Sequence, residues 1–546
     1  MYQPPVAGLL QLTDTWDRDG ETGMPQNVEI VVEPYEEEQA GRFARRRDAL
    51  AEHDRVREYL GDLDPSTVQV LGPHLPERKG DESSPFVATV FDPRENRAVE
   101  VRGRLDSDDV ELVSSSFRPN PTAEELRAAA EILRADEQFA NLRNRDDVVV
   151  YQPMPPTSDV ERDDGTSVRR IGLGVLDPQA PVPHRYAAVD VLNRAVEWDP
   201  GWFDSLDGDC ESSLPVGVES LPDAGGRDSV RVRVLRAGEE LWNLVVVRPR
   251  ASAPTHFGKG SGVELRFVTY RGRLVLWQAH VPILNVLYDD GVTYRDWQNQ
   301  ETPFLADGVD PVGPGWRVCT SPPATILESG TDAGNFQGVA LHYEDGELRI
   351  VSEVQAGWYR YMSDWRLRDD GTIAPRFGFA GTRNPRTCMR HQHHVYWRLD
   401  FDIEGAGNDV VEERGLVFPG HPLWWRLTQE TKRVRSFFAR RWRVLDGGTG
   451  RGYSITPGPA DGTADSYGVA DLWFLRYHGD ELDDGVNTVG GTPADTRCRL
   501  DQYLTGESID GTDVVVWYAG HFIHDEEHPS PHQGHIVGPE LRPINW

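Results

Sequence analysis

The sequence predicts a mainly β protein, in which a large carboxy-terminal β-sandwich follows two small α+β domains. Short segments with alternating apolar residues recur from residue 229 nearly to the end of the chain, separated by Gly, Asp and Asn turns. The amino-terminal part instead combines helical patterns with a few short strand candidates. The 53 glycines and 39 prolines agree with many turns between short strands.

The chain divides into five predicted parts. The second small domain begins with the clearest helix signal, because Thr122 and Glu125 have the spacing of a capping box before an Ala-rich run. A stretch rich in Ser, Asp, Gly and Pro then predicts a linker. The predicted parts are an arm (1–25), a first small α+β domain (26–118), a second small α+β domain (119–203), the linker (204–228) and the sandwich (229–546).

The charge balance indicates an acidic surface. The chain has 57 Lys+Arg against 89 Asp+Glu, a formal net charge of −32, and its lysines are Lys79, Lys259 and Lys432. Such a surface is typical of halophilic proteins, since salt at 1 M shortens the Debye length to ~3 Å and makes self-repulsion tolerable. It argues against nucleic acid as a partner, because phosphate binding needs a basic surface.

The sequence lacks the patterns of membrane-spanning helices, of a signal peptide and of clustered cysteines. No run of 18 apolar residues predicts a membrane helix, and the start of the chain has no signal-peptide pattern, so we expect a cytoplasmic protein with no membrane contact. The four cysteines are widely spaced without a CxxC, which signals neither a zinc ribbon nor a disulfide framework.

A histidine-rich strand is the strongest candidate for chemistry. His391 and His393 share one face of a period-two pattern with Val395 and Trp397. Two imidazoles on one buried strand face need partners, and a metal ion is a suitable one. A third ligand would come from His521 or His524, which follow a strand at 514–518. Three imidazoles with open positions suit Cu(II) or Zn(II).

The other face of the same strand carries two acids, and three more histidines follow His524 towards the end of the chain. Asp400 and Asp402 could hold a hard cation through oxygen. We expect His528, His532 and His535 to be solvated loop residues.

The segment from His391 resembles the metal strand of the copper amine oxidases. His391-Gln-His393 is followed five residues later by Arg398-Leu-Asp400, as in that family. The resemblance spans about 225–546, and several further blocks match in the same order. These blocks are Trp442-Arg-Val, Gly452–Gly458, Leu472–Tyr477 with Glu481, and Asp513–Trp517 with His524 seven residues further on.

The resemblance implies a homodimer with one copper ion per chain, on His391, His393 and His524 rather than His521. It implies a topaquinone cofactor made by copper and O2 from Tyr359. The implied activity is oxidative deamination of a primary amine to an aldehyde, with release of ammonia and hydrogen peroxide. It also implies a second site, for calcium or manganese, whose ligands would be Asp400, Asp402, Asp513 and the backbone oxygens of Phe401 and Val514.

The sequence departs from the family beside the cofactor. Trp358 and Arg360 flank Tyr359, where the family has Asn and an acid. Two other readings therefore remain open: a copper-binding non-oxidase on the same scaffold that has lost the quinone chemistry, and a structural dimer without a transition metal.

A second departure concerns the catalytic base. Tyr288 matches an active-site Tyr of the family, but the position fourteen residues on, where the family has its base, is Thr302. The adjacent Glu301 is a possible substitute, although it belongs to the opposite strand face. A family disulfide is also predicted to be lost, because Ala340 stands where the partner of Cys319 is expected.

Overall fold

The computed structural model describes most of the chain. The described residues are 28–35, 45–61, 68–74, 79, 85–161, 167–201, 210–221, 225–252, 259–418, 421–435, 441–525 and 535–546. The predicted arm at 1–25 and the loop residues His528 and His532 lie outside them. Among the described residues, no helix combines the length and the apolar composition needed to cross a lipid bilayer.

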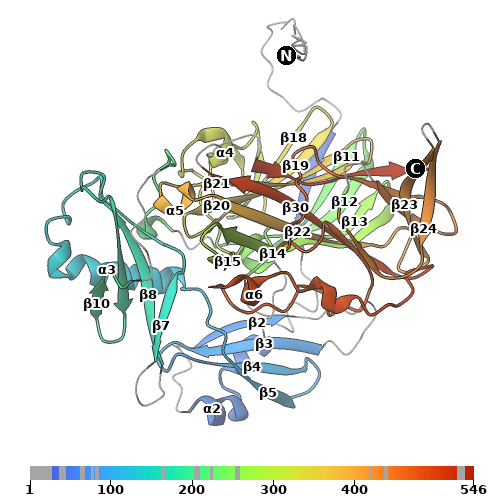
Figure 1. Cartoon of the computed structure of the whole chain (residues 1–546). Helices are drawn as coiled ribbons and strands as arrows, with labels where there is room; N and C mark the ends of the chain where they lie inside the picture. The colour runs from blue at the N-terminus through green and yellow to red at the C-terminus, as the bar shows by residue number, and fades with distance from the viewer. Residues whose placement is uncertain are drawn as a thin grey trace, which may run out of the picture.

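Two large sheets packed face to face form the carboxy-terminal part, which confirms the predicted mainly β fold with a large sandwich (Figure 1). Buried residues of both sheets form one continuous core, including Leu265 and Val395 of one sheet and Leu341 and Val444 of the other. The first sheet follows the order β1 (Val28–Pro34), β11 (Ser229–Arg236), β12 (Glu239–Val247), β13 (Glu264–Tyr270), β14 (Arg273–Tyr288), β22 (His391–Phe401), β30 (Val514–His524), β28 (Leu472–Arg476), β25 (Thr431–Arg433). In addition, β15 (Thr293–Arg295) pairs with β14, and β29 (Gly490–Gly491) pairs with β15.

The second sheet completes the sandwich. It follows the order β16 (Gly308–Val309), β17 (Trp316–Cys319), β18 (Val339–Glu344), β19 (Glu347–Ala356), β20 (Tyr359–Arg368), β21 (Ile373–Gly381), β32 (Glu540–Ile544), β27 (Gly452–Thr456), β26 (Trp442–Asp446), β23 (Asp409–Phe418), β24 (His421–Leu427), with β31 (Ile536–Val537) beside β21. Short helices connect some strands: α4 (Ile326–Ser329), α5 (Pro385–Cys388) and α6 (Pro493–Thr496).

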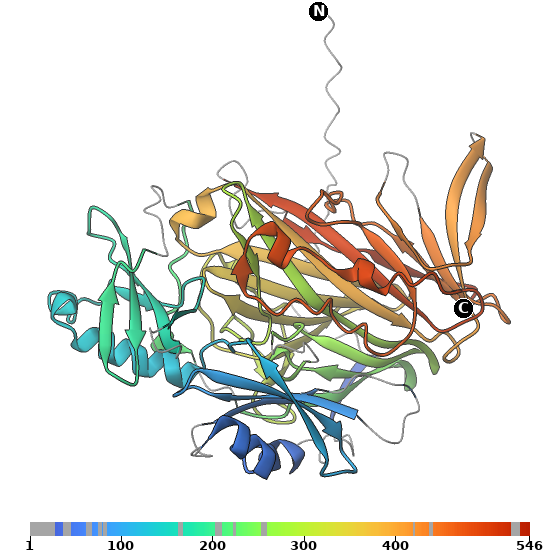
Figure 2. The same ribbon diagram turned by 60° about the horizontal axis from the view of Figure 1, so that its bottom comes forward.

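Two small α+β units lie against the sandwich (Figure 2). The first holds a four-stranded sheet of β2 (Gln69–His74), β3 (Pro85–Asp92), β4 (Arg97–Arg104) and β5 (Val110–Ser115), with α2 (Asp54–Leu60). The second holds β6 (Val149–Tyr151), β7 (Thr157–Glu161), β8 (Ser167–Leu176), β9 (His184–Asp190) and β10 (Ala195–Trp198), covered by α3 (Ala123–Ala135). The predicted capping box of Thr122 and Glu125 is present at the start of α3.

Two segments differ from the predicted division of the chain. Residues Val28–Pro34, predicted within the first small domain, pair with β11 as the edge strand of the large sheet. The segment predicted as a linker is packed where the structure describes it, since Val218 and Leu221 belong to the core of the second small unit. Long-range strand pairing places the first segment in the large sheet, and burial of isolated apolar residues orders the second. Neither effect can be predicted from local composition.

The cysteine spacing signals no disulfide framework, but the structure contains a disulfide. Cys210 and Cys388 form it; they are 178 positions apart in sequence, and their Cα atoms are 5.3 Å apart. Spacing rules could not reveal this pair, because they recognise clustered cysteines. Cys319 carries a free, buried thiol, which confirms the predicted loss of a disulfide at that position.

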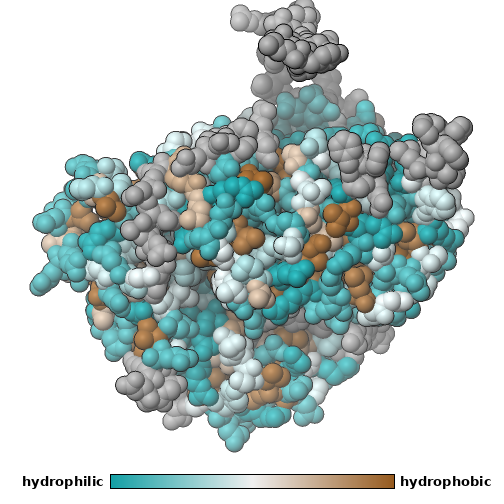
Figure 3. Space-filling model, viewed as in Figure 1, coloured by the Kyte–Doolittle hydropathy of each residue, from teal (hydrophilic) through white to brown (hydrophobic). Residues whose placement is uncertain are grey.

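The surface is mainly hydrophilic on the face that Figure 3 draws, with small separated hydrophobic patches. Exposed large apolar side chains such as Val182, Leu192 and Val309 are scattered over different elements. This distribution agrees with the acidic composition, and single exposed apolar residues are normal for folded proteins.

Strand register brings the predicted site together. β22 lies between β14 and β30, and His391 is paired with Tyr288 on one side and with His524 on the other. β22 is a strand because its inward residues Val395, Trp397 and Leu399 are apolar and almost completely buried. Tyr359 opens β20 in the facing sheet. The candidate site therefore lies between the two sheets.

Candidate metal centre and its tyrosine

His391 and His524 face each other across neighbouring strands. Nε2 of His391 lies 3.2 Å from Nδ1 of His524. A metal–imidazole bond is about 2.0–2.1 Å, so two nitrogens on one ion are about 3 Å apart. These two nitrogens already have that separation.

His393 is the third histidine of this group. Its ring centroid is 4.9 Å from that of His391. Its Nε2 is buried and has no hydrogen-bond partner in the described part of the chain. Its Nδ1 lies 3.4 Å from the hydroxyl of Tyr361. Among the described residues, the ligand atoms of the three histidines are not all within 4.8 Å of one another.

The histidines are held in the state that metals bind. Nδ1 of His391 lies 2.6 Å from the carbonyl oxygen of Met389 and donates to it, which leaves the Nε2 lone pair facing the site. Burial, together with neighbouring imidazoles, lowers the pKa of His391 and of His393 well below the ordinary value. Both rings are therefore neutral, as a metal ligand must be.

His521, the alternative third ligand, lies on the other face of β30. Its Nδ1 is 2.7 Å from Nδ1 of His394, and its Nε2 is 3.0 Å from Oδ1 of Asp471. The structure thus groups His524, and not His521, with His391 and His393.

Tyr359 lies directly against the histidines. Its hydroxyl donates to Nε2 of His391 at 2.8 Å and also hydrogen-bonds to the hydroxyl of Tyr288. The Tyr359 side chain is completely buried, and the ring of Phe379 packs 4.9 Å away, centroid to centroid. Burial raises the pKa of Tyr359 well above the ordinary value, so the phenol stays protonated.

The two residues that replace the family's neighbours have structural partners. Nε1 of Trp358 lies 3.4 Å from the hydroxyl of Tyr288, which it helps to orient. The guanidinium of Arg360 is fully buried in a two-point ion pair with Asp332, with Nε–Oδ1 2.6 Å. It also donates to the carbonyl oxygens of Gly357 and Tyr359, so its charge is directed to the backbone and to Asp332.

A buried carboxyl group near Tyr359 was missed by the sequence reasoning. Oδ2 of Asp296 accepts a hydrogen bond from Tyr361, whose ring is next to that of Tyr359. Oδ1 of Asp296 is buried with no hydrogen-bond partner in the described part of the chain. Burial raises the pKa of Asp296 to about 7, against the opposing effects of the Tyr361 hydrogen bond and of Lys259.

The hairpin between β14 and β15 explains why Asp296 was missed. Leu287 pairs with Thr293, so the chain returns to the site after a short turn and Asp296 follows Tyr288 by eight residues. Counting fourteen residues on reaches a different segment. The Asp-Asp-Gly sequence of this short turn is the signal from which the return of the chain to the site could have been predicted.

The positions predicted for the base are engaged elsewhere. Both oxygens of Glu301 bind the buried guanidinium of Arg248, with Nε–Oε1 3.0 Å. The backbone N–H of Thr302 donates to the carbonyl oxygen of Glu353, while its hydroxyl is buried. The described contacts of these two residues do not include Tyr359. Glu301 instead lines a surface cleft of about 270 Å³ with Asn120, Arg250 and Gln300 among its walls.

A second carboxylate comes from the segment predicted as a linker. Oε1 of Glu211 lies 2.8 Å from Nε2 of His524, and the Glu211 side chain is almost completely buried. The adjacent Cys210 is tied to Cys388, three residues before His391. The disulfide thus holds Glu211 beside the histidines.

His535 is also part of this region. It is 2 % exposed, and its ring centroid is 5.0 Å from that of His524. The expectation that it is a solvated loop residue is wrong, because Phe379 and Phe522 pack against it.

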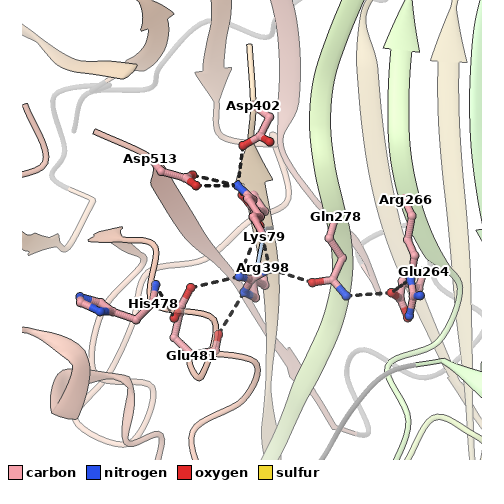
Figure 4. Close-up of polar contacts among 10 residues, drawn as sticks. Lys79, Glu264, Arg266, Gln278, Arg398, Asp402, His478, Glu481 and Asp513 are labelled. Atoms are coloured by element: carbon pink, nitrogen blue, oxygen red, sulfur yellow. Dashed lines mark hydrogen bonds and ion pairs between the residues drawn. The ribbon is translucent and has the colours of Figure 1, made fainter. Parts of the chain in front are cut away.

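The acids predicted for the second metal come together, but with a lysine among them. Carboxylate oxygens of Asp400, Asp402 and Asp513 lie within 4.8 Å of one another. Phe401 and Val514, whose backbone oxygens were predicted as further ligands, are paired across β22 and β30. The Nζ atom of Lys79 binds all three acids, and Figure 4 shows its contacts with Asp402 and Asp513.

The fold is similar to that of a solved copper-containing amine oxidase. The structure of a copper-containing benzylamine oxidase from Hansenula polymorpha aligns with a TM-score of 0.56 and 15% identity, covering 87% of this chain and 92% of that one. Pichia pastoris lysyl oxidase aligns with a TM-score of 0.47 and 12% identity, covering 88% and 85%. No family model matches the sequence.

A sequence comparison points the same way. Primary amine oxidase 2 of Arabidopsis thaliana is 24% identical over 250 residues, an alignment that covers 36% of this chain and 36% of that protein. The chain thus matches about a third of the length of this curated relative. In fold, and in sequence over about a third of its length, the chain is similar to these amine oxidases.

Proposed function

We propose that the chain is a copper-dependent oxidase of primary amines, which forms an aldehyde, ammonia and hydrogen peroxide with O2 as the oxidant. The observation that supports this most is the 2.8 Å hydrogen bond between the Tyr359 phenol and Nε2 of His391. It sets an oxidisable ring directly beside a neutral, buried imidazole nitrogen. When bound, copper and the quinone derived from Tyr359 would supply the redox and electrophilic chemistry.

The residues present fit a copper ion. His391, His393 and His524 would hold it, since two of their nitrogens are 3.2 Å apart and the third residue has a buried, unpartnered Nε2 among the described residues. The 3.4 Å contact of His393 with Tyr361 uses Nδ1, so it leaves Nε2 available for the ion.

The chain's own residues have distinct roles in this proposal. Tyr288 fixes the hydroxyl of Tyr359, and Trp358 in turn orients Tyr288. Asp296 is the base that takes the α-proton of the bound amine, because it is the buried carboxyl near the ring and its pKa is close to neutral. The complete burial of Tyr359 keeps bulk water from the reacting ring.

The second candidate is a copper-binding protein on the same scaffold without quinone chemistry. Trp358 and Arg360 favour it, because neither offers the amide or the acid that the family places beside its cofactor. In this case the histidines would still bind copper, while Tyr359 would remain an ordinary tyrosine.

The family resemblance supports a homodimer, and the acidic composition supports a high-salt environment. The Cys210–Cys388 disulfide counts against a reducing cytoplasm, because such bonds persist mainly in oxidising compartments.

The two candidates are separated by loading the metal-free protein with copper in air. The proposed oxidase stains for a quinone in a gel and releases hydrogen peroxide with at least one of a panel of primary amines. Copper binding without a stain or peroxide would support the non-oxidase instead.

A further inference from the structure

The acid trio, which we define as Asp400, Asp402 and Asp513, already holds a positive charge supplied by the chain. Nζ of Lys79 lies 2.8 Å from Asp400 Oδ1, 2.5 Å from Asp402 Oδ1 and 2.9 Å from both oxygens of Asp513. The Lys79 side chain is 11% exposed, and those of Asp400 and Asp402 are nearly fully buried. The contacts with Asp400 and Asp513 have the length of charge-assisted hydrogen bonds.

Two aromatic rings also lie near the ammonium group. Nζ of Lys79 lies 4.3 Å from the ring centroid of Tyr477 and 5.8 Å from that of Trp277. Such rings attract an organic cation through their π faces. A calcium ion instead needs six to eight oxygen ligands at about 2.3–2.6 Å. The surroundings therefore suit an ammonium group better than a hard divalent ion.

The charges agree with a resident lysine. Three carboxylates surround the one ammonium group of Lys79, so the attraction between opposite charges offsets the cost of burying it. Arg398 adds a second positive charge, 3.5 Å from Asp400 and 3.0 Å from Glu481 (Figure 4). A compact ammonium group with three donors matches three carboxylates, whereas the planar fork of arginine does not. This match gives a physical reason for a lysine at position 79, in a chain whose basic residues are nearly all arginine.

We propose that Lys79 is the permanent cation of this site, in place of the calcium or manganese ion that the fold family implies, and that it fastens the first small unit to the sandwich. Lys79 lies between β2 and β3 of that unit. Asp400 belongs to β22, Asp402 directly follows β22, and Asp513 directly precedes β30, so the acid trio belongs to the sandwich. The contact joins residues more than 320 positions apart in sequence.

Chemical labelling tests the proposal on the intact wild-type protein. An amine-acetylating reagent is applied with and without calcium chloride, and the modification of each lysine is followed by mass spectrometry. Lys432, which is 38% exposed in its pair with Asp501, is the internal control. We expect Lys432 to react at least tenfold faster than Lys79, with or without calcium. Calcium-dependent exposure of Lys79 would overturn the proposal, because the ion would then be the natural occupant.

Substitution gives a second, independent readout. We expect K79M to bind one calcium ion more per chain than the wild type by titration calorimetry, and the extra site to disappear in K79M/D402N. The matched K432M variant should bind no more than the wild type. If the wild type itself binds calcium and D402N abolishes this binding, Lys79 is not the resident cation. These measurements do not depend on amine oxidation, so their failure is distinguishable from failure of the proposed function.

Discussion

The hydroxyl of Tyr359 donates a 2.8 Å hydrogen bond to Nε2 of His391, the nitrogen that also lies 3.2 Å from Nδ1 of His524. This relationship joins a strand of each sheet at one point. It makes the tyrosine and the proposed copper ligands one unit, so a change on either side has a defined effect on the other.

Replacement of a ligand should abolish copper binding. We expect His391→Ala to lower copper to well below one ion per chain by elemental analysis, and Tyr359 to remain unmodified. His521→Ala is the matched control, since it removes a buried imidazole from the neighbouring strand on the opposite face. Equal copper loss in both variants would contradict the ligand assignment.

Replacement of the proposed base should separate cofactor formation from turnover. We expect Asp296→Asn to retain copper and the quinone stain but to lower kcat/KM by ~10²–10⁴-fold, the usual contribution of a positioned base. Thr302→Ala is the control, because Thr302 stands at the position predicted from sequence. If Thr302→Ala loses the activity and Asp296→Asn keeps it, the structural assignment is wrong.

The pKa of Asp296, raised by burial to about 7, predicts a pH dependence. The carboxylate is the active form of a base, so kcat/KM should rise with pH through about 7 and then level off. The effect on stability has the opposite sign. The folded protein retains the proton between about 4 and 7 while the unfolded chain loses it, so this group's contribution to the free energy of unfolding falls as pH rises. Asp296→Asn should remove both trends in pH titrations of rate and of unfolding.

The Cys210–Cys388 disulfide should be measurable by thiol counting. Of the four cysteines, two are free, so the denatured protein should show two reactive thiols before reduction and four after it. We expect Cys210→Ser to lower the free energy of unfolding by about 2–4 kcal/mol. It should also weaken copper retention, because Glu211 loses its anchor beside His524. Cys319→Ser, at a free thiol, should not affect copper.

Local pattern in the sequence predicted part of this site. The period of two from His391 onward placed two histidines on one buried face, and the apolar residues of that face formed the strand as expected. The choice of His524 rested on family resemblance, because the pairing of β22 with β30 joins segments more than 100 residues apart.

The remaining site residues depend on contacts that no local pattern encodes. Glu211 reaches His524 through a disulfide between distant cysteines, and Lys79 reaches the acid trio from another unit. Asp296 is closer in sequence, but a short hairpin turn decides its position. Strand periodicity therefore determines which residues of one strand share a face, whereas tertiary pairing determines which distant residues join them.

The most direct test of the proposed function is the mass of the peptide that contains Tyr359, measured after the metal-free protein is exposed to copper and O2. The account predicts that this peptide gains oxygen and loses hydrogen at Tyr359 in the wild type and stays unchanged in His391→Ala. An unmodified Tyr359 in wild-type protein that has bound one copper ion per chain would contradict it.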